Sequence, residues 1–153
     1  MTRAVTLECG SADGACLDDL ARLHGECFAT PWPASDFARL LAMPGAFSII
    51  ARDGNATAGF ILARGAGDEA EIITLGVAQP FRRRGIASRL LERAADRLRA
   101  DGAVALFMEV AQDNEAAVGL YRMNGFETVG SRPAYYRAPD GTRSDAVVMK
   151  RQL

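Results

Sequence analysis

Three side chains in the last third of the chain have the types and spacing needed to move protons beside a bound ligand. Glu109 follows the apolar run 103–108, where burial disfavours a charged carboxylate and suits it to work as a general base near neutral pH. Asn114 and Tyr121 are seven residues apart, about 700° of helix, so both leave nearly the same face. With the small Ala117 between them, that face offers an amide, a gap and a phenol. The alternatives are an exposed edge-strand glutamate, a helix cap and a packed tyrosine.

A basic turn precedes the most regular helical pattern in the chain. A helix start exposes unpaired N–H groups and the positive end of the helix dipole, and small residues there let a ligand approach the backbone. Arginines beside such a turn suit a pyrophosphate. The order of strand, proline turn, RxxGxA and helix favours this over a solvated basic helix start, and it is neither a dinucleotide-binding GxGxxG nor a Walker loop. The residues are Arg82, Arg83, Arg84, Gly85, Ile86, Ala87 and Ser88.

The elements that must position these residues follow from hydrophobic periodicity and turn signals. We expect strands at 5–8, 46–52, 57–64, 70–77, 103–111, 126–131 and 144–151. We expect helices at about 13–27, 35–41, 86–98 and 114–123, the second capped by Ser35 or Asp36. The strand–helix–strand order at 71–110 implies a parallel pair within a mostly antiparallel sheet. The predicted fold is α/β (α+β): a mixed sheet of six to seven strands flanked by four helices.

Composition predicts one cytoplasmic domain over residues 1–153. Hydrophobic residues make up 49% of the chain and the net charge is −1, which favours a packed core and argues against direct nucleic-acid binding. Cys9, Cys16 and Cys27 are odd in number and lack metal-ligand spacing, so we predict reduced thiols, no disulfide and no metal. The start of the chain lacks the apolar core of a secretory signal, and no run is long enough to span a membrane. A nucleophilic pair of Cys27 and His24 lacks a third orienting group.

Two groups of residues resemble a known family. Leu75, Gly76 and Val77, followed by Arg82 through Ala87, resemble the acetyl-CoA motif Q/R-x-x-G-x-G/A of the GNAT acetyltransferases. The downstream pattern is similar to that of the bacterial ribosomal-protein alanine N-acetyltransferases (the RimI type). It comprises Met108-Glu109-Val110, Asn114, Gly119-Leu120-Tyr121 and Asn124-Gly125-Phe126, with further matches at Phe28, Pro31-Trp32, Tyr135-Tyr136, Asp140-Gly141 and Asp145-Ala146.

The resemblance implies the GNAT fold and a direct acetyl transfer from acetyl-CoA, without a metal. Glu109 would be the base and Tyr121 the acid that protonates the departing sulfur, while backbone N–H groups near Val77 would polarise the thioester carbonyl. The acceptor would be the N-terminal alanine of the small-subunit ribosomal protein numbered eighteen. The cofactor would be held by Leu75, Gly76, Val77, Arg82 through Ser88, and Asn114. The acceptor side would be walled by Trp32, Tyr135 and Tyr136, for which packing in surface loops is the alternative.

The sequence determines the identity of the acceptor less closely than it determines the acetyl transfer. Ala111 stands where the family pattern has arginine, and Pro133-Ala134 replaces its usual polar pair, both on the acceptor side. An α-amine has a pKa of roughly 7.7–8.0 against about 10.4 for lysine, so deprotonating lysine at pH 7 costs about 3.5 kcal/mol more. This favours an N-terminal amine over a lysine or a small-molecule amine. An acetyl-CoA-sensing domain without activity would need neither Glu109 nor Tyr121.

Overall fold

The computed structural model describes residues 4–10 and 13–153. The start of the chain, which we expect to lack a secretory signal, includes residues 1–3, and these lie outside the described residues. Its strands are β1 Thr6–Gly10, β2 Ala46–Asp53, β3 Ala56–Ala66, β4 Glu69–Val77, β5 Ala105–Ala111, β6 Glu127–Arg137 and β7 Arg143–Gln152. Its helices are α1 Gly14–Cys27, α2 Ala34–Leu41, α3 Ile86–Ala100 and α4 Glu115–Met123, with a 3₁₀ turn, η1, at Gln79–Phe81. No helix in the described part of the chain is long and apolar enough to cross a membrane.

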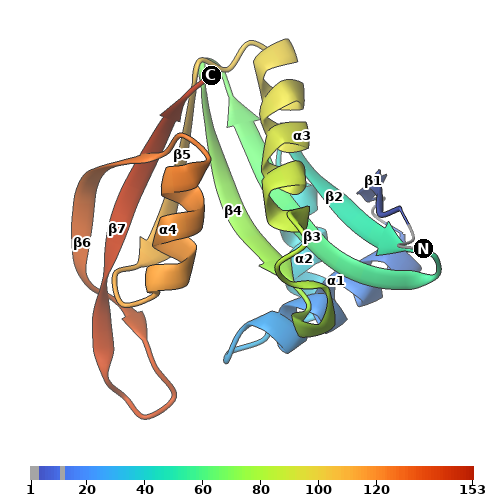
Figure 1. The fold of residues 1–153 in the computed structure, drawn as a ribbon, viewed down its shortest axis with the longest axis horizontal. Helices are drawn as coiled ribbons and strands as arrows, with labels where there is room; N and C mark the ends of the chain where they lie inside the picture. Colours follow the sequence, from blue (N-terminus) through green and yellow to red (C-terminus); the bar gives the residue numbers. More distant parts are fainter. Residues whose placement is uncertain (1–3, 11–12) are drawn as a thin grey trace.

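The strands form one seven-stranded sheet in the order β1-β2-β3-β4-β5-β7-β6. Strands β4 and β5 pair in parallel, and the other neighbouring strands of the described sheet pair antiparallel. The predicted mixed sheet with one parallel pair and four flanking helices is therefore confirmed. Figure 1 shows α3 crossing β2, β3 and β4, and α4 lying beside the β5–β7–β6 half of the sheet.

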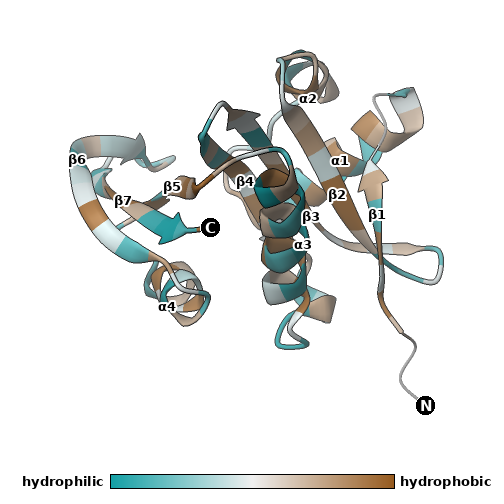
Figure 2. Cartoon of the chain, turned by 90° about the horizontal axis from the view of Figure 1, so that it is seen from above, coloured by the Kyte–Doolittle hydropathy of each residue, from teal (hydrophilic) through white to brown (hydrophobic). Residues whose placement is uncertain are grey.

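Helices cover both faces of the sheet. Helices α3 and α4 lie on one face and α1 and α2 on the other (Figure 2). Because successive side chains of a strand point to opposite faces, neighbouring residues of β2 enter different cores: Ile49 packs in the α3 cluster and Ile50 in the α1–α2 cluster. In α3, the buried residues Ile86, Leu90, Leu91, Ala94, Ala95 and Leu98 follow the helical period read from the sequence.

The ladder between β4 and β5 is short, and the structure shows why. It joins Glu69 to Ala105, Ala70 to Leu106 and Glu71 to Phe107. On the other edge of β4 the register with β3 shifts, so that Ile72 and Thr74 face consecutive β3 residues and Ile73 is an extra residue. An extra residue bends a strand and increases its twist. Strand β4 therefore turns away from β5 directly after their last paired residues, and the two strands diverge in Figure 1.

Two local expectations were wrong. Helix α2 begins at Ala34, directly after Pro33, and makes no side-chain cap bond, so neither Ser35 nor Asp36 is its cap. Proline already fixes the extended backbone at this helix entry. Strand β6 continues to Arg137, so Tyr135 and Tyr136 lie in a strand and not in a loop. A bulge between Arg132 and Tyr136 accommodates Pro133 within this strand.

The end of α1 is fixed to the following segment through His24. This side chain is only 2% exposed, and its ring stacks on the rings of Phe28 and Trp32 at 4.4 and 4.5 Å. Its Nδ1 accepts the backbone N–H of Trp32 at 3.1 Å. Burial lowers the pKa of His24 to about 4, so the folded protein holds the neutral ring at neutral pH.

The buried His24 predicts a loss of stability in mild acid. Its pKa in the folded chain lies below the ordinary value of 6.5, so between pH 6.5 and about 4 the unfolded chain binds a proton that the folded chain does not. Stability from this group is complete above that window and falls as the pH falls. Between pH 7 and 5 the loss is about 2 kcal/mol. Urea unfolding of wild type and His24→Gln across this range should show a steeper dependence in wild type. Parallel curves would contradict the prediction.

Candidate active site

The last residues of β4 form one wall of the candidate site. Beyond Glu71, the edge of β4 that faces β5 has no ladder partner from β5. Leu75 and Val77 pack on the α3 core. Gly76 faces the other way, and a Cβ there would lie 2.9 Å from Cys27 Sγ. A side chain at Gly76 would therefore collide with the end of α1, while the opposite edge of this part of β4 has no strand partner from β5.

The basic turn has the backbone geometry of an anion site. Arg83 and Gly85 both adopt positive φ, 64° and 74°, a conformation that costs a non-glycine residue some free energy. Gly85 precedes α3 without a side-chain cap bond, so the first N–H groups of α3 receive no such bond. Open space surrounds the position where a Gly85 Cβ would stand. Unpaired amides beside open space fit a phosphate group.

The three arginines of this turn have different roles. Arg82 Nε donates to the carbonyl of Val77 at 2.9 Å and so fixes the end of β4. Arg84 lies 3.7 Å from Asp53 and above the ring of Phe81. For Arg83 the structure records no side-chain partner among the described residues, which leaves its guanidinium available to an anion.

Cys27 lies against the same strand end. Burial raises the pKa of its thiol more than the neighbouring Arg82 lowers it. His24 Nδ1 is already bonded to the Trp32 amide. Cys27 is therefore held as a neutral thiol, which favours the structural interpretation of this residue over a Cys–His nucleophile.

Glu109 lies in β5, on the opposite side of the separation. Its side chain is 25% exposed, and Arg132 Nε lies 3.0 Å from its Oε1. The hydroxyl of Tyr136 donates to the backbone carbonyl of Glu109 at 3.1 Å. The Glu109 carboxylate is thus partly exposed and is paired with a cation from β6.

Tyr121 projects from α4 into the core and is 5% exposed. Burial, with a smaller effect of Tyr136, raises its pKa. Burial together with the Glu109 charge raises the pKa of Tyr136 to about 12. Both phenols therefore keep their protons at neutral pH. Tyr136 bonds to the Glu109 carbonyl, and the ring that packs on Tyr121 is that of Phe126.

Asn114 acts as the N-cap of α4: its Oδ1 accepts the N–H of Ala117 at 3.2 Å. The helix-cap interpretation of this residue is thus what the structure shows, and its Nδ2 has no recorded partner among the described residues. Ser88, expected at the cofactor, accepts a hydrogen bond from Asn124 Nδ2 at 3.1 Å. Asn124 also bonds to the Leu120 carbonyl. Sequence analysis identified Asn124 as part of the family pattern at the end of a helix and missed its bond to α3.

The expected acceptor-side aromatics belong to two segments. Trp32 lies after α1 and packs on His24, whereas Tyr135 is exposed in β6 and Tyr136 turns toward Glu109. The α1–α2 connection and the β6–β7 hairpin project at the end of the sheet toward which β4 and β5 diverge (Figure 1). Within the described part of the chain, Trp32 makes its ring contacts with His24 and Phe37 and not with the tyrosines.

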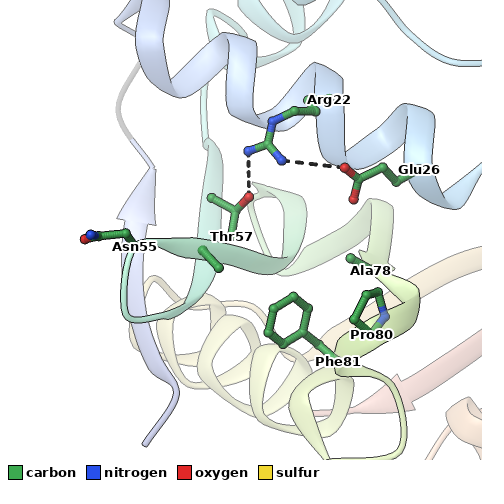
Figure 3. A pocket seen from close by; sticks show the side chains of 8 residues that line it. Arg22, Glu26, Asn55, Thr57, Ala78, Pro80 and Phe81 are labelled. Carbon is green, nitrogen blue, oxygen red and sulfur yellow. Dashed lines mark hydrogen bonds and ion pairs between the residues drawn. The ribbon is translucent and has the colours of Figure 1, made fainter. Parts of the chain in front are cut away.

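A hollow of about 320 Å³ lies elsewhere, between α1, β3 and η1 (Figure 3). Arg22 in this hollow already bonds to Thr57 and pairs with Glu26. None of the expected site residues lines it; its walls are Arg22, Glu26, Asn55, Ala56, Thr57, Ala78, Pro80 and Phe81.

Comparison with known proteins gives the family. The acetyltransferase (GNAT) family model matches residues 17–126. The chain belongs to the GNAT family. It is 37% identical to the N-alpha-acetyltransferase RimI of Mycobacterium tuberculosis, over 98% of this chain and 94% of that protein. The match to the ribosomal protein bS18-alanine N-acetyltransferase of Escherichia coli is 38% identical over 54% of this chain, and spans about half (55%) of that protein.

Solved GNAT structures agree with the fold. The E. coli ribosomal-protein-S18-alanine N-acetyltransferase superposes with a TM-score of 0.87 at 28% identity, over 97% of this chain and 94% of that one. Arabidopsis thaliana NAA60, solved in complex with acetyl-CoA, has a TM-score of 0.86 over 98% of this chain and 99% of that one. At 19% identity that second likeness shows the fold alone. This GNAT chain is an N-acetyltransferase.

The bond between α3 and α4 predicts a measurable coupling. Asn124→Ala removes both hydrogen bonds of its amide and should lower the free energy of unfolding by about 1–2 kcal/mol. Ser88→Ala should cost less, and the double variant should cost less than the sum, because both substitutions remove the same bond. Urea denaturation of the four proteins provides the cycle. Strict additivity would show that the bond contributes nothing to stability.

Proposed function

We propose that this GNAT chain transfers the acetyl group of acetyl-CoA to the N-terminal amine of a protein, with the N-terminal alanine of a small-subunit ribosomal protein as substrate. The observation that supports this most directly is the separation of β4 from β5. Next to this separation lie the edge of β4 that has no β5 partner, the basic start of α3, and the titratable side chains of Glu109 and Tyr121. The similarity to N-terminal acetyltransferases supports the choice of acceptor.

The residues present fit the cosubstrate. The amides at the start of α3, together with Arg83, would hold its pyrophosphate. The edge of β4 at Leu75, Gly76 and Val77 offers peptide groups to an amide-bearing arm, and Asn114 Nδ2 could donate to the same arm. Acetyl-CoA supplies an acetyl thioester that a neutral amine can attack directly.

Glu109 and Tyr121 would carry the two proton transfers. The Glu109 carboxylate removes the proton from the incoming ammonium, directly or through a water molecule. Tyr121 keeps its proton through the neutral range, because burial raises its pKa, and gives it to the departing sulfur. Backbone N–H groups near Val77 polarise the carbonyl under attack. No covalent enzyme intermediate is needed.

The function can be tested by mass spectrometry of reaction products. The purified chain is given acetyl-CoA with a ribosomal-protein N-terminal peptide, with polyamines or with aminoglycosides. We expect acetylation at the peptide α-amine. Turnover of the small amines without turnover of the peptide would overturn the proposed acceptor.

Glu109→Gln should lower kcat/KM at pH 7 by about 100-fold or more, the range attributed to a positioned general base. The affinity for coenzyme A should stay unchanged, because Glu109 is assigned to the amine. Glu127→Gln, on the exposed β6, is the matched control and should behave as wild type. Undiminished turnover of Glu109→Gln would exclude this residue as the base.

Arg83→Ala should weaken binding of coenzyme A by roughly 10-fold or more, as expected for loss of a charge-assisted hydrogen bond. Isothermal titration calorimetry measures the dissociation constant. Arg93→Ala, an exposed arginine further along α3, is the control and should leave it unchanged. Equal constants in all three proteins would mean that the backbone alone holds the pyrophosphate.

A further inference from the structure

The segment that joins α1 to α2 lies on the side of the sheet to which Glu109 points. Met108 and Val110 of β5 pack in the α3 cluster, so Glu109 between them points to the opposite face. Helices α1 and α2 lie on that opposite face (Figure 2). The α1–α2 connection, residues 28–33, therefore lies on the same side of the sheet as the carboxylate that is proposed to receive the acceptor.

One hydrogen bond fixes the backbone of this connection. Among the described residues, the Trp32 N–H is the only backbone group of residues 29–32 with a recorded hydrogen bond, and it donates to His24 Nδ1 at 3.1 Å. Pro31 packs beside Gly25 of α1, where a Cβ would lie 3.5 Å from the proline Cβ. The connection thus folds back onto α1, and a side chain, not a backbone carbonyl, receives its amide.

Four aromatic rings hold the His24 imidazole in the position that this bond requires. The imidazole stacks on Phe28 and Trp32 of the connection. It also lies edge-on to Phe37 of α2, with ring centroids 5.7 Å apart, and tilted to Phe60 of β3 at 6.3 Å. Packing against the connection, α2 and β3 therefore sets the orientation of the ring, and with it the direction of the Nδ1 lone pair.

The same surroundings keep Nδ1 free of a proton. The rings that pack on His24 carry no charge, and the Cys27 thiol of α1 is neutral because burial raises its pKa. Burial lowers the pKa of His24 to about 4. The neutral imidazole therefore presents a lone pair at Nδ1 and carries its proton on Nε2. The bond to the Trp32 amide persists throughout the neutral pH range.

We propose that His24 is a positioning residue for the acceptor: its Nδ1 fixes the Trp32 backbone, and thereby the wall that the α1–α2 connection presents to the substrate peptide. The inference rests on the proposed function, in which the acceptor amine gives its proton to Glu109. His24 is only 2% exposed, so it acts through Trp32 and not by contact with the substrate. Loss of the bond weakens acceptor binding and leaves the proton transfers unchanged.

The test uses two substitutions that separate the hydrogen bond from the stacking. His24→Phe keeps an aromatic ring and removes the acceptor atom, whereas His24→Asn places an oxygen near the position of Nδ1 and removes the ring. Steady-state kinetics with the ribosomal-protein N-terminal peptide and saturating acetyl-CoA give KM and kcat. We expect His24→Phe to raise the peptide KM by about 5- to 10-fold, the effect of one lost hydrogen bond, with kcat within about 2-fold of wild type. His24→Asn should recover most of the lost affinity.

Two controls accompany these variants. Isothermal titration calorimetry with coenzyme A on the same preparations should give an unchanged dissociation constant, because the cofactor is assigned to the end of β4, the start of α3 and Asn114. The binding stoichiometry gives the folded fraction and corrects kcat, while KM does not depend on that fraction. Arg39→Gln removes an exposed arginine of α2 and should leave KM and kcat unchanged. His24→Gln, whose oxygen lies nearer the position of Nε2, is a second variant without the bond if His24→Phe does not fold.

The outcomes distinguish this inference from the proposed function. A wild-type peptide KM in His24→Phe, or a fall in kcat without a rise in KM, would overturn the inference and leave the proposed function intact. An equal rise in KM in His24→Asn would show that the stacking, and not the bond to Trp32, places the connection, and would also overturn the inference. Absence of α-amine turnover in wild type would overturn the proposed function, and this inference with it.

Discussion

The structure depends on one extra residue in one strand. Ile73 has no place in the ladder between β3 and β4, and the bulge it forms turns β4 away from β5 after only three paired positions. Backbone groups removed from a ladder must find other partners or water. Here they face a region bordered by a helix start without a side-chain cap and by α4. In the proposed function, the binding of an amide-rich ligand is thus a direct consequence of an interrupted hydrogen-bond pattern.

The end of the ladder between β4 and β5 divides the sheet into two halves, which carry different parts of the proposed site. Strands β1 to β4, covered by α3 on one face and by α1 and α2 on the other, provide the basic turn and most of the two hydrophobic cores, and the α3 core extends to β5, α4 and β7. Strands β5, β7 and β6 hold Glu109 and Arg132, while α4 holds Tyr121. The short parallel ladder joins these halves, and the Asn124–Ser88 hydrogen bond adds a second connection at the helices. Proton transfer in the proposed reaction requires both halves to keep their relative position.

Sequence analysis predicted what short-range patterns determine. The buried face of α3 follows from helical spacing, and strand β5 follows from the nearly continuous apolar run at 103–111. The bulge at Ile73, the start of α2 after Pro33 and the extension of β6 past Pro133 carry no such period. The ion pair of Arg132 with Glu109 joins strands that are adjacent only through β7. The stacking around His24 depends on a segment that folds back onto α1. Such contacts follow from tertiary structure and were not available from spacing.

Cys27 lies on Gly76, at the end of the strand proposed to border the thioester. A thiolate in that position could accept the acyl group by transthioesterification and remove it from the productive route. Burial keeps the sulfur protonated despite the adjacent arginine, and a protonated thiol is a poor nucleophile. In the proposed reaction, the packing that requires glycine in the strand would therefore also protect the activated acyl group from a competing acceptor within the enzyme itself.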